Sequence, residues 1–193
     1  MSFLSSQPSV AKEGAFENNA VARTTVAESC SRCFGNGWKK YLVVTDYYSR
    51  YPEIAYLPNL TCRTVVGKLK SIFARWGILE ISISDNDPPF SAAAFESFSN
   101  QYGFTHVTSS PYLPQANGEA EIAVKIAKRI LKQEDPFMAL KVYRATPISA
   151  TAVSPSQLMM GRRLRTTVPT LSRNLEPEWP DFACVQRSDE RAK

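Results

Sequence analysis

Cysteine and histidine are both scarce in this sequence, which has four cysteines and one histidine among 193 residues. Cys30 and Cys33 form a single C-x-x-C pair, and Cys62 and Cys184 stand far from it. A structural zinc site needs four ligands, and a disulfide framework needs regularly spaced cysteines, so the composition argues against both. We therefore expect reduced cysteines and a reducing compartment.

Long apolar runs are missing as well. No stretch approaches the roughly eighteen apolar residues of a membrane-spanning helix. The first six residues have neither the basic part nor the apolar part of a secretory signal, so we expect no membrane among the partners. Hydrophobic residues still make up 44% of the chain, which is enough for a core and excludes a wholly disordered chain.

Acidic residues are absent from one long stretch of a chain whose formal charge is +5. No acid lies between Asp135 and Glu176, whereas this stretch contains six basic residues: Lys141, Arg144, Arg162, Arg163, Arg165 and Arg173. Clustered Lys and Arg attract nucleic-acid phosphates regardless of sequence, but they also occur on ordinary solvated surfaces. The charge pattern alone leaves both interpretations open.

The apolar patterns predict an α/β domain over residues 38–165. Strands are expected over 41–45, 53–57, 81–84 and 104–108, and helices over 64–76, 91–101 and 119–134, with two more that start near 136 and 154. Strands that alternate with helices favour a mixed sheet flanked by helices. Residues 1–37 are expected to be a disordered or atypical leader, and residues 166–193 an extended C-terminal tail.

Two acids stand where catalytic groups often lie. Asp85 ends a predicted strand, and Glu121 begins the strongest helix 36 positions later, so 35 residues separate them. At about 100° per residue, Lys125, Lys128 and Lys132 return to the face of Glu121. An ordinary ion pair between Glu121 and Lys125 is the simpler explanation, but it does not account for three lysines in line.

Five motifs occur in order between residues 38 and 190. They are TDYYSRYPE (45–53), SDNDPPF (84–90), SSPYLPQANGEAE (109–121), YRATP (143–147) and SPSQLMMGR (154–162). Together they resemble the integrase catalytic core of gypsy-type (Ty3-like) LTR retrotransposons, within the retroviral integrase superfamily. The zinc module that precedes this core in the family and the tail that follows it are not found, so we expect a core truncated at both ends.

The resemblance implies an RNase H-like fold and three carboxylates that bind Mg²⁺ or Mn²⁺ for polynucleotidyl transfer during DNA integration. Asp85 and Glu121 match the second and third catalytic acids, and both would be metal ligands. The resemblance also implies DNA as partner, self-association into a homo-oligomer, and a nuclear location, with the cytoplasm as the alternative, although no targeting signal is present.

Several residues around Glu121 are candidates for DNA contact. Lys125 and Lys128 match positions that face the DNA backbone in related integrases, and Lys132 continues the same row. Within the loop expected over 109–118, Tyr112 could stack on a base, while Gln115 and Asn117 could donate to phosphates. His106 lies inside a predicted strand and is expected to be structural.

The first catalytic acid is not found. In related integrases it lies fourteen residues before the position of Asp46, which here is Arg32, and no Asp precedes Asp46. Glu28 is the nearest acid and would need a loop four residues longer; we expect it to be a solvated loop residue, and Asp46 to serve a turn or to pair with Arg50. The first strand would then be missing or replaced.

Two functions follow from this sequence. The first is an enzyme, an integrase-type polynucleotidyl transferase that binds DNA and uses Asp85, Glu121 and an undetermined third metal ligand; without the first acid we expect it to bind metal weakly and to be inactive alone. The second is a transposon-derived domain without catalysis that binds DNA or a protein. The presence or absence of the first acid divides them.

Overall fold

The computed structural model describes residues 23–34, 37–84, 88–108 and 114–192. Its strands are β1 (Arg23–Phe34), β2 (Gly37–Asp46), β3 (Pro52–Leu57), β4 (Ile81–Ser84) and β5 (Thr105–Thr108). Its helices are α1 (Cys62–Trp76), α2 (Pro88–Ser91), α3 (Ala93–Tyr102), α4 (Pro114–Leu131), α5 (Pro136–Ala145), α6 (Pro155–Met160), the 3₁₀ helix η1 (Ser172–Leu175) and α7 (Phe182–Ala192).

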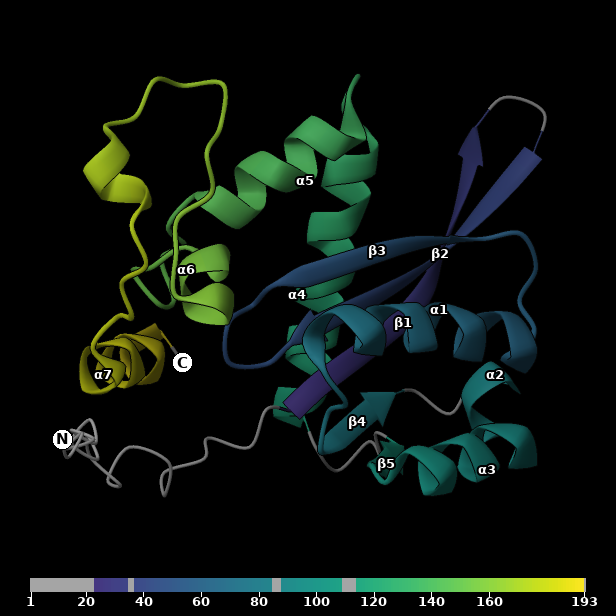
Figure 1. Ribbon diagram of the computed structural model, residues 1–193. Coiled ribbons are helices and arrows are strands. Elements are labelled where there is room, and N and C mark those ends of the chain that lie inside the picture. The colour runs from purple at the N-terminus through teal and green to yellow at the C-terminus, as the bar shows by residue number, and fades with distance from the viewer. Residues whose placement is uncertain (1–22, 35–36, 85–87, 109–113, 193) are drawn as a thin grey trace, which may run out of the picture.

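The strands form one mixed sheet in the order β3-β2-β1-β4-β5 (Figure 1). β1, β2 and β3 are antiparallel neighbours, whereas β4 runs parallel to β1 and β5 runs parallel to β4. The mixed sheet predicted from the sequence is therefore confirmed. Because β1 pairs on both edges, it is the central strand.

The leader predicted over residues 1–37 is wrong for its second half. Residues 23–34 form β1, and β2 already begins at Gly37, so the core starts near residue 23 rather than 38. Residues 1–22 lie outside the described part of the chain. The sequence of β1 is mostly small and polar, and its strand state follows from hydrogen bonding to two neighbours, which local propensity does not reveal.

The extended tail predicted over residues 166–193 is also wrong, because η1 and α7 lie within it. α7 packs on the turn between β2 and β3. Its Asp189 pairs with Arg50 at 2.9 Å, and the ring of Phe182 stacks on Tyr48 with centroids 5.7 Å apart. The side chain of Val185 in α7 is buried. These contacts join residues far apart in the sequence, so the partner surface of this short polar helix could not be seen from its own sequence.

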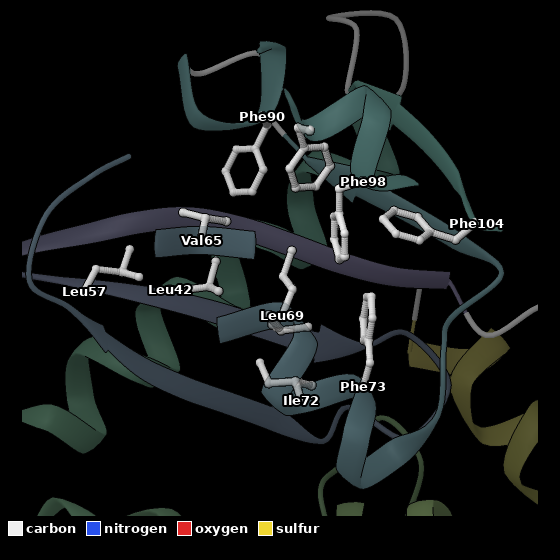
Figure 2. Packing of buried hydrophobic residues seen from close by; sticks show 11 residues of the cluster. Leu42, Leu57, Val65, Leu69, Ile72, Phe73, Phe90, Phe98 and Phe104 are labelled. Carbon is white, nitrogen blue, oxygen red and sulfur yellow. The ribbon is translucent and has the colours of Figure 1, made fainter. Parts of the chain in front are cut away.

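Both faces of the sheet are covered by helices. Alternate residues of β2 divide between the two layers, since Leu42 and Val44 face α1 and α3 whereas Val43 faces α4. Figure 2 shows the larger layer, in which rings from α3 and the segment before β5 meet side chains of α1. Its buried members are Leu42, Val44, Leu57, Val65, Leu69, Ile72, Phe73, Phe90, Phe95, Phe98 and Phe104.

Glu53 of β3 joins three elements in a half-buried polar cluster. Its carboxylate accepts a 2.7 Å hydrogen bond from the indole of Trp76 and pairs with Arg75 and Arg144, each at 3.3 Å. The guanidinium of Arg144 also lies 4.3 Å from the ring centre of Tyr51. The cluster fastens α1 and α5 to the same edge of the sheet.

Replacing Glu53 by Gln should lower the free energy of unfolding by about 1.5–3 kcal/mol, because a largely buried carboxylate that serves two cations and an indole is lost. Urea denaturation measures this. Glu80→Gln is the matched control, since Glu80 is exposed, and it should change stability by less than about 0.5 kcal/mol. Equal stability of the two variants would contradict a structural role for the cluster.

Candidate functional site

The row of charged residues on α4 lies on the solvent side of that helix. Glu121 and Lys125 are 70% and 73% exposed and form an ion pair at 3.7 Å, and Lys128 and Lys132 are exposed as well. Ala123, Ala127, Ile130 and Leu131 are buried on the other side. The predicted row of Glu121 and the three lysines is thus seen on one side of the helix, and Ile122 beside Glu121 is 51% exposed.

Four other candidates fall wholly or partly outside the described part of the chain. Asp85 and Tyr112 lie outside it, so the predicted approach of Asp85 to Glu121 stays a prediction. Gln115 and Asn117 belong to the start of α4 rather than to a loop, and only their backbone is described. Pro114 is the first residue of that helix, which suits proline because the N–H it lacks would be unpaired there anyway.

The first residues of β1 lie beside β4. Thr25 stands beside Ile83 in the parallel ladder, and Ala27 is two residues further along β1. Ala27 also pairs with Val43, and Val43 packs on Ala123 and Ala127 of α4. Since paired residues in a ladder share a face of the sheet, position 27 is on the face of α4, near the turn that bears Glu121.

The register corrects two expectations about the first acid. Arg32 pairs with Lys39, five residues beyond Ala27 and about 16 Å further along the strand, so Arg32 does not take the place of the missing acid. Glu28 is in β1 and not in a loop. Between Ala27 and Cys30 the ladder contains one extra residue, so that Glu28 and Ser29 together stand opposite Leu42, the residue that faces the α1 layer.

The side chain of Asp46 stabilises a turn, as the sequence indicated. Its carboxylate accepts hydrogen bonds from the backbone N–H of Ser49 at 2.8 Å and from the Ser49 hydroxyl at 2.6 Å. It pairs with Thr24 at the amino end of β1, whereas position 85 follows the carboxyl end of β4. Sites in such sheets lie at the carboxyl ends of parallel strands, so Asp46 is at the wrong edge.

His106 supports the last residue of β4 from the neighbouring strand. Its Nε2 lies 2.9 Å from the Ser84 hydroxyl, and its ring contacts Phe95 with centroids 4.7 Å apart. Burial lowers the pKa of His106 below its ordinary value, which favours the neutral ring. The contacts agree with a structural role directly beside the segment that carries Asp85.

Two bridged Mg²⁺ ions need about three carboxylates, one of them shared. Among the residues that the structure describes, no three His, Cys, Asp or Glu side chains gather in one place. Asp85 lies outside those residues, so the predicted metal site of Asp85 and Glu121 stays a prediction.

Residues 24–114 match the family described as "Integrase core domain". An uncharacterized protein of Caenorhabditis elegans, K02A2.6, is 32% identical over 140 residues, or 67% of this chain and 11% of its own length. The Gag-Pol polyprotein of walleye dermal sarcoma virus is 29% identical over 139 residues, or 65% of this chain and 8% of its own. The chain thus spans about a tenth of these relatives.

Solved structures show the same fold. The catalytic core of BIV integrase superposes with a TM-score of 0.59 at 20% identity, covering 72% of this chain and 94% of that one. The HTLV-2 integrase catalytic core, solved with magnesium in a trimeric form, gives 0.60 at 14% identity and covers 72% and 96%. The fold is RNase H-like, and the chain contains a core domain of the retroviral integrase superfamily.

Integrase core domains bind DNA, form oligomers and use divalent metal ions. No helix in the described ranges of this chain has the length and apolar character to cross a membrane.

The lowered pKa of His106 predicts a pH dependence of stability. The unfolded chain takes up a proton near pH 6.5 and the folded chain only below that value, so stability should fall as pH drops from 7.5 toward 5.5. His106 is the only histidine, which makes the assignment direct. Urea titrations at the two pH values measure the effect, and in His106→Gln the difference should shrink. An unchanged difference in that variant would exclude His106 as its source.

Proposed function

We propose that this chain is a DNA-binding integrase core of the polynucleotidyl-transferase type, that it is related to gypsy-type retrotransposon integrases, and that it is catalytically inactive alone. Asp85 and Glu121 are the two acids of the triad that remain. With two carboxylates, Mg²⁺ or Mn²⁺ would be held singly and weakly. When bound as a pair in a complete site, such ions stabilise the charge that develops on the phosphodiester oxygens.

The observation that carries the proposal is the position of Ala27. It follows the residues of β1 that pair with β4, and it pairs with Val43, the β2 residue that packs on α4. A carboxylate at this position would lie on the face of the sheet that α4, the helix of Glu121, covers. Glu28 is one residue further on, in the irregular part of β1, opposite a residue of the other layer.

The surface of α4 supports DNA binding. Lys125, Lys128 and Lys132 are exposed in one row, and Arg129 is exposed beside them. Cations arranged along a helix neutralise successive phosphates and release counterions, which gives affinity without sequence preference. We propose these residues as the phosphate contacts, with Tyr112, Gln115 and Asn117 as further contacts near the start of α4.

We also propose that the chain self-associates and that it acts where it meets DNA, in the nucleus, with the cytoplasm as the alternative. Exposed apolar side chains on α5 support self-association, since Phe137 is 86% exposed and Val142 is 46% exposed. A light-scattering mass equal to one chain at every concentration would refute it.

Substituting Lys125 and Lys128 together by Glu should weaken DNA binding equally for all sequences, because these contacts are made to phosphates. The slope of log K against log salt should fall by about two units, corresponding to two lost phosphate contacts. Fluorescence anisotropy with a labelled duplex at several salt concentrations measures both quantities.

Arg63→Glu with Lys68→Glu is the matched control for this experiment. It makes the same change in net charge on α1, which covers the other face of the sheet. The control should retain most of the affinity. An equal loss in both double variants would mean that α4 is not the DNA-binding surface.

The wild-type chain should show no metal-dependent cleavage or rejoining of a branched DNA substrate above a Glu121→Gln blank, with Mg²⁺ or Mn²⁺. Losing charge stabilisation of about 4 kcal/mol at such a centre lowers the rate about a thousandfold. Ala27→Asp adds a carboxylate on the face of the sheet that α4 covers, so it should raise metal-dependent turnover above the blank.

Two further variants separate the alternatives. Glu28→Gln and Asp46→Asn should show the same metal-dependent turnover as the wild-type chain, because neither residue is assigned to the metal site. If the wild-type chain did turn over and Glu28→Gln abolished the activity, Glu28 would be the third acid. If Asp46→Asn abolished it instead, the register described above would not be the one in use.

A further inference from the structure

Trp179 is held in a fixed position although most of its surface faces solvent. The indole is 69% exposed. The backbone N–H of Glu178 donates to the carbonyl oxygen of Gly161 at 2.6 Å, which anchors the segment on the end of α6. Three ring atoms lie 2.6, 2.8 and 2.9 Å from the place where a Cβ on Gly161 would be.

Gly161 makes this arrangement possible in two ways. It ends α6 in the left-handed conformation, with φ +66°, which side chains disfavour, and it leaves room for the ring to lie against its backbone. Pro177 and Pro180 on either side of Trp179 limit the backbone further. One face of the indole is therefore packed on the helix end, and the rest of the ring is open.

The segment that begins at Gly161 is rich in basic residues. Arg162 and Arg163 follow Gly161 directly, Arg165 and Arg173 lie in the same segment, and all four are exposed. Within the described ranges none of the four has an ion pair or a hydrogen bond from its guanidinium group. Three acids also occur in the segment, Glu176, Glu178 and Asp181, but the Asp181 carboxylate accepts the N–H of Ala183 at the start of α7.

We propose that Trp179, with Arg162 and Arg163, forms a stacking site for an unpaired nucleobase at a DNA end. The proposal rests on the DNA-binding function argued above and adds a second contact surface to it. An open indole face stacks on any base, and guanidinium groups beside it bind the flanking phosphates. The bases of an intact duplex are stacked on each other, so the site favours single-stranded segments over blunt duplex.

The segment that carries this site is separate from the α4 row. In Figure 1 the chain between α6 and α7, including η1, lies beside α6 on the side away from the sheet. A DNA molecule bound along α4 could therefore present an unpaired end to Trp179 without competing for Lys125 and Lys128. The two surfaces should then be distinguishable by substrate.

The test compares Trp179→Ala with wild type on three labelled DNAs: a single strand, a duplex with a single-stranded overhang, and a blunt duplex of equal length. Trp179→Ala should weaken binding of the single strand and of the overhang by at least about fivefold. This factor corresponds to the lower end of the range of affinity losses for one stacked base. Binding of the blunt duplex should change less than twofold. Trp179→Phe should recover part of the loss, because it keeps a stacking face.

Arg162→Gln with Arg163→Gln should reproduce the selective loss and also lower the salt dependence on the single strand. Thermal unfolding checks that each variant remains folded. Equal binding of the single strand by Trp179→Ala and wild type would overturn the proposal, as would an equal loss on all three DNAs. Failure of wild type to bind any of them would refute the DNA-binding function itself.

Discussion

The pairing of β1 on both of its edges is the constraint on which the rest of the architecture depends. Its antiparallel partner β2 supplies the alternation that sends Leu42 to one helical layer and Val43 to the other. Its parallel partner β4 joins it through the pairs that run from Arg23 and Ile81 to Thr25 and Ile83. α4 lies across β1 and β2. Without β1 the two halves of the sheet would share no ladder.

The elements with strong local signals could be predicted from the sequence. The apolar spacing of α1, the alternation of β4 and the capping residues Asp135 and Ser154 each identify an element without reference to the rest of the chain. β1 and α7 could not be predicted in this way. Their state depends on partners far away in the sequence, including the ion pair between Arg50 and Asp189.

The same distinction applies to the candidate site. The face of α4 follows from helical periodicity, so the exposure of Glu121 and the lysines was predictable. The register of β1 against β2 was not, because counting back from Asp46 assumes a hairpin of fixed length and regular pairing. Only the ladder reveals that Ala27 pairs with Val43 and that one extra residue follows it in β1. The exposure of Ile122 likewise depends on how α5 and α7 are placed.

The ion pair between Arg50 and Asp189 has a consequence for how the chain matures on the ribosome. The side chain of Arg50 is 9% exposed, and its carboxylate partner is encoded 139 positions later. Until α7 has been synthesised, the turn after β2 holds a guanidinium without this carboxylate, and such a group resists burial. The turn and α7 can reach their final packing only after α7 has emerged, so this corner closes later than the pairing of β2 with β3.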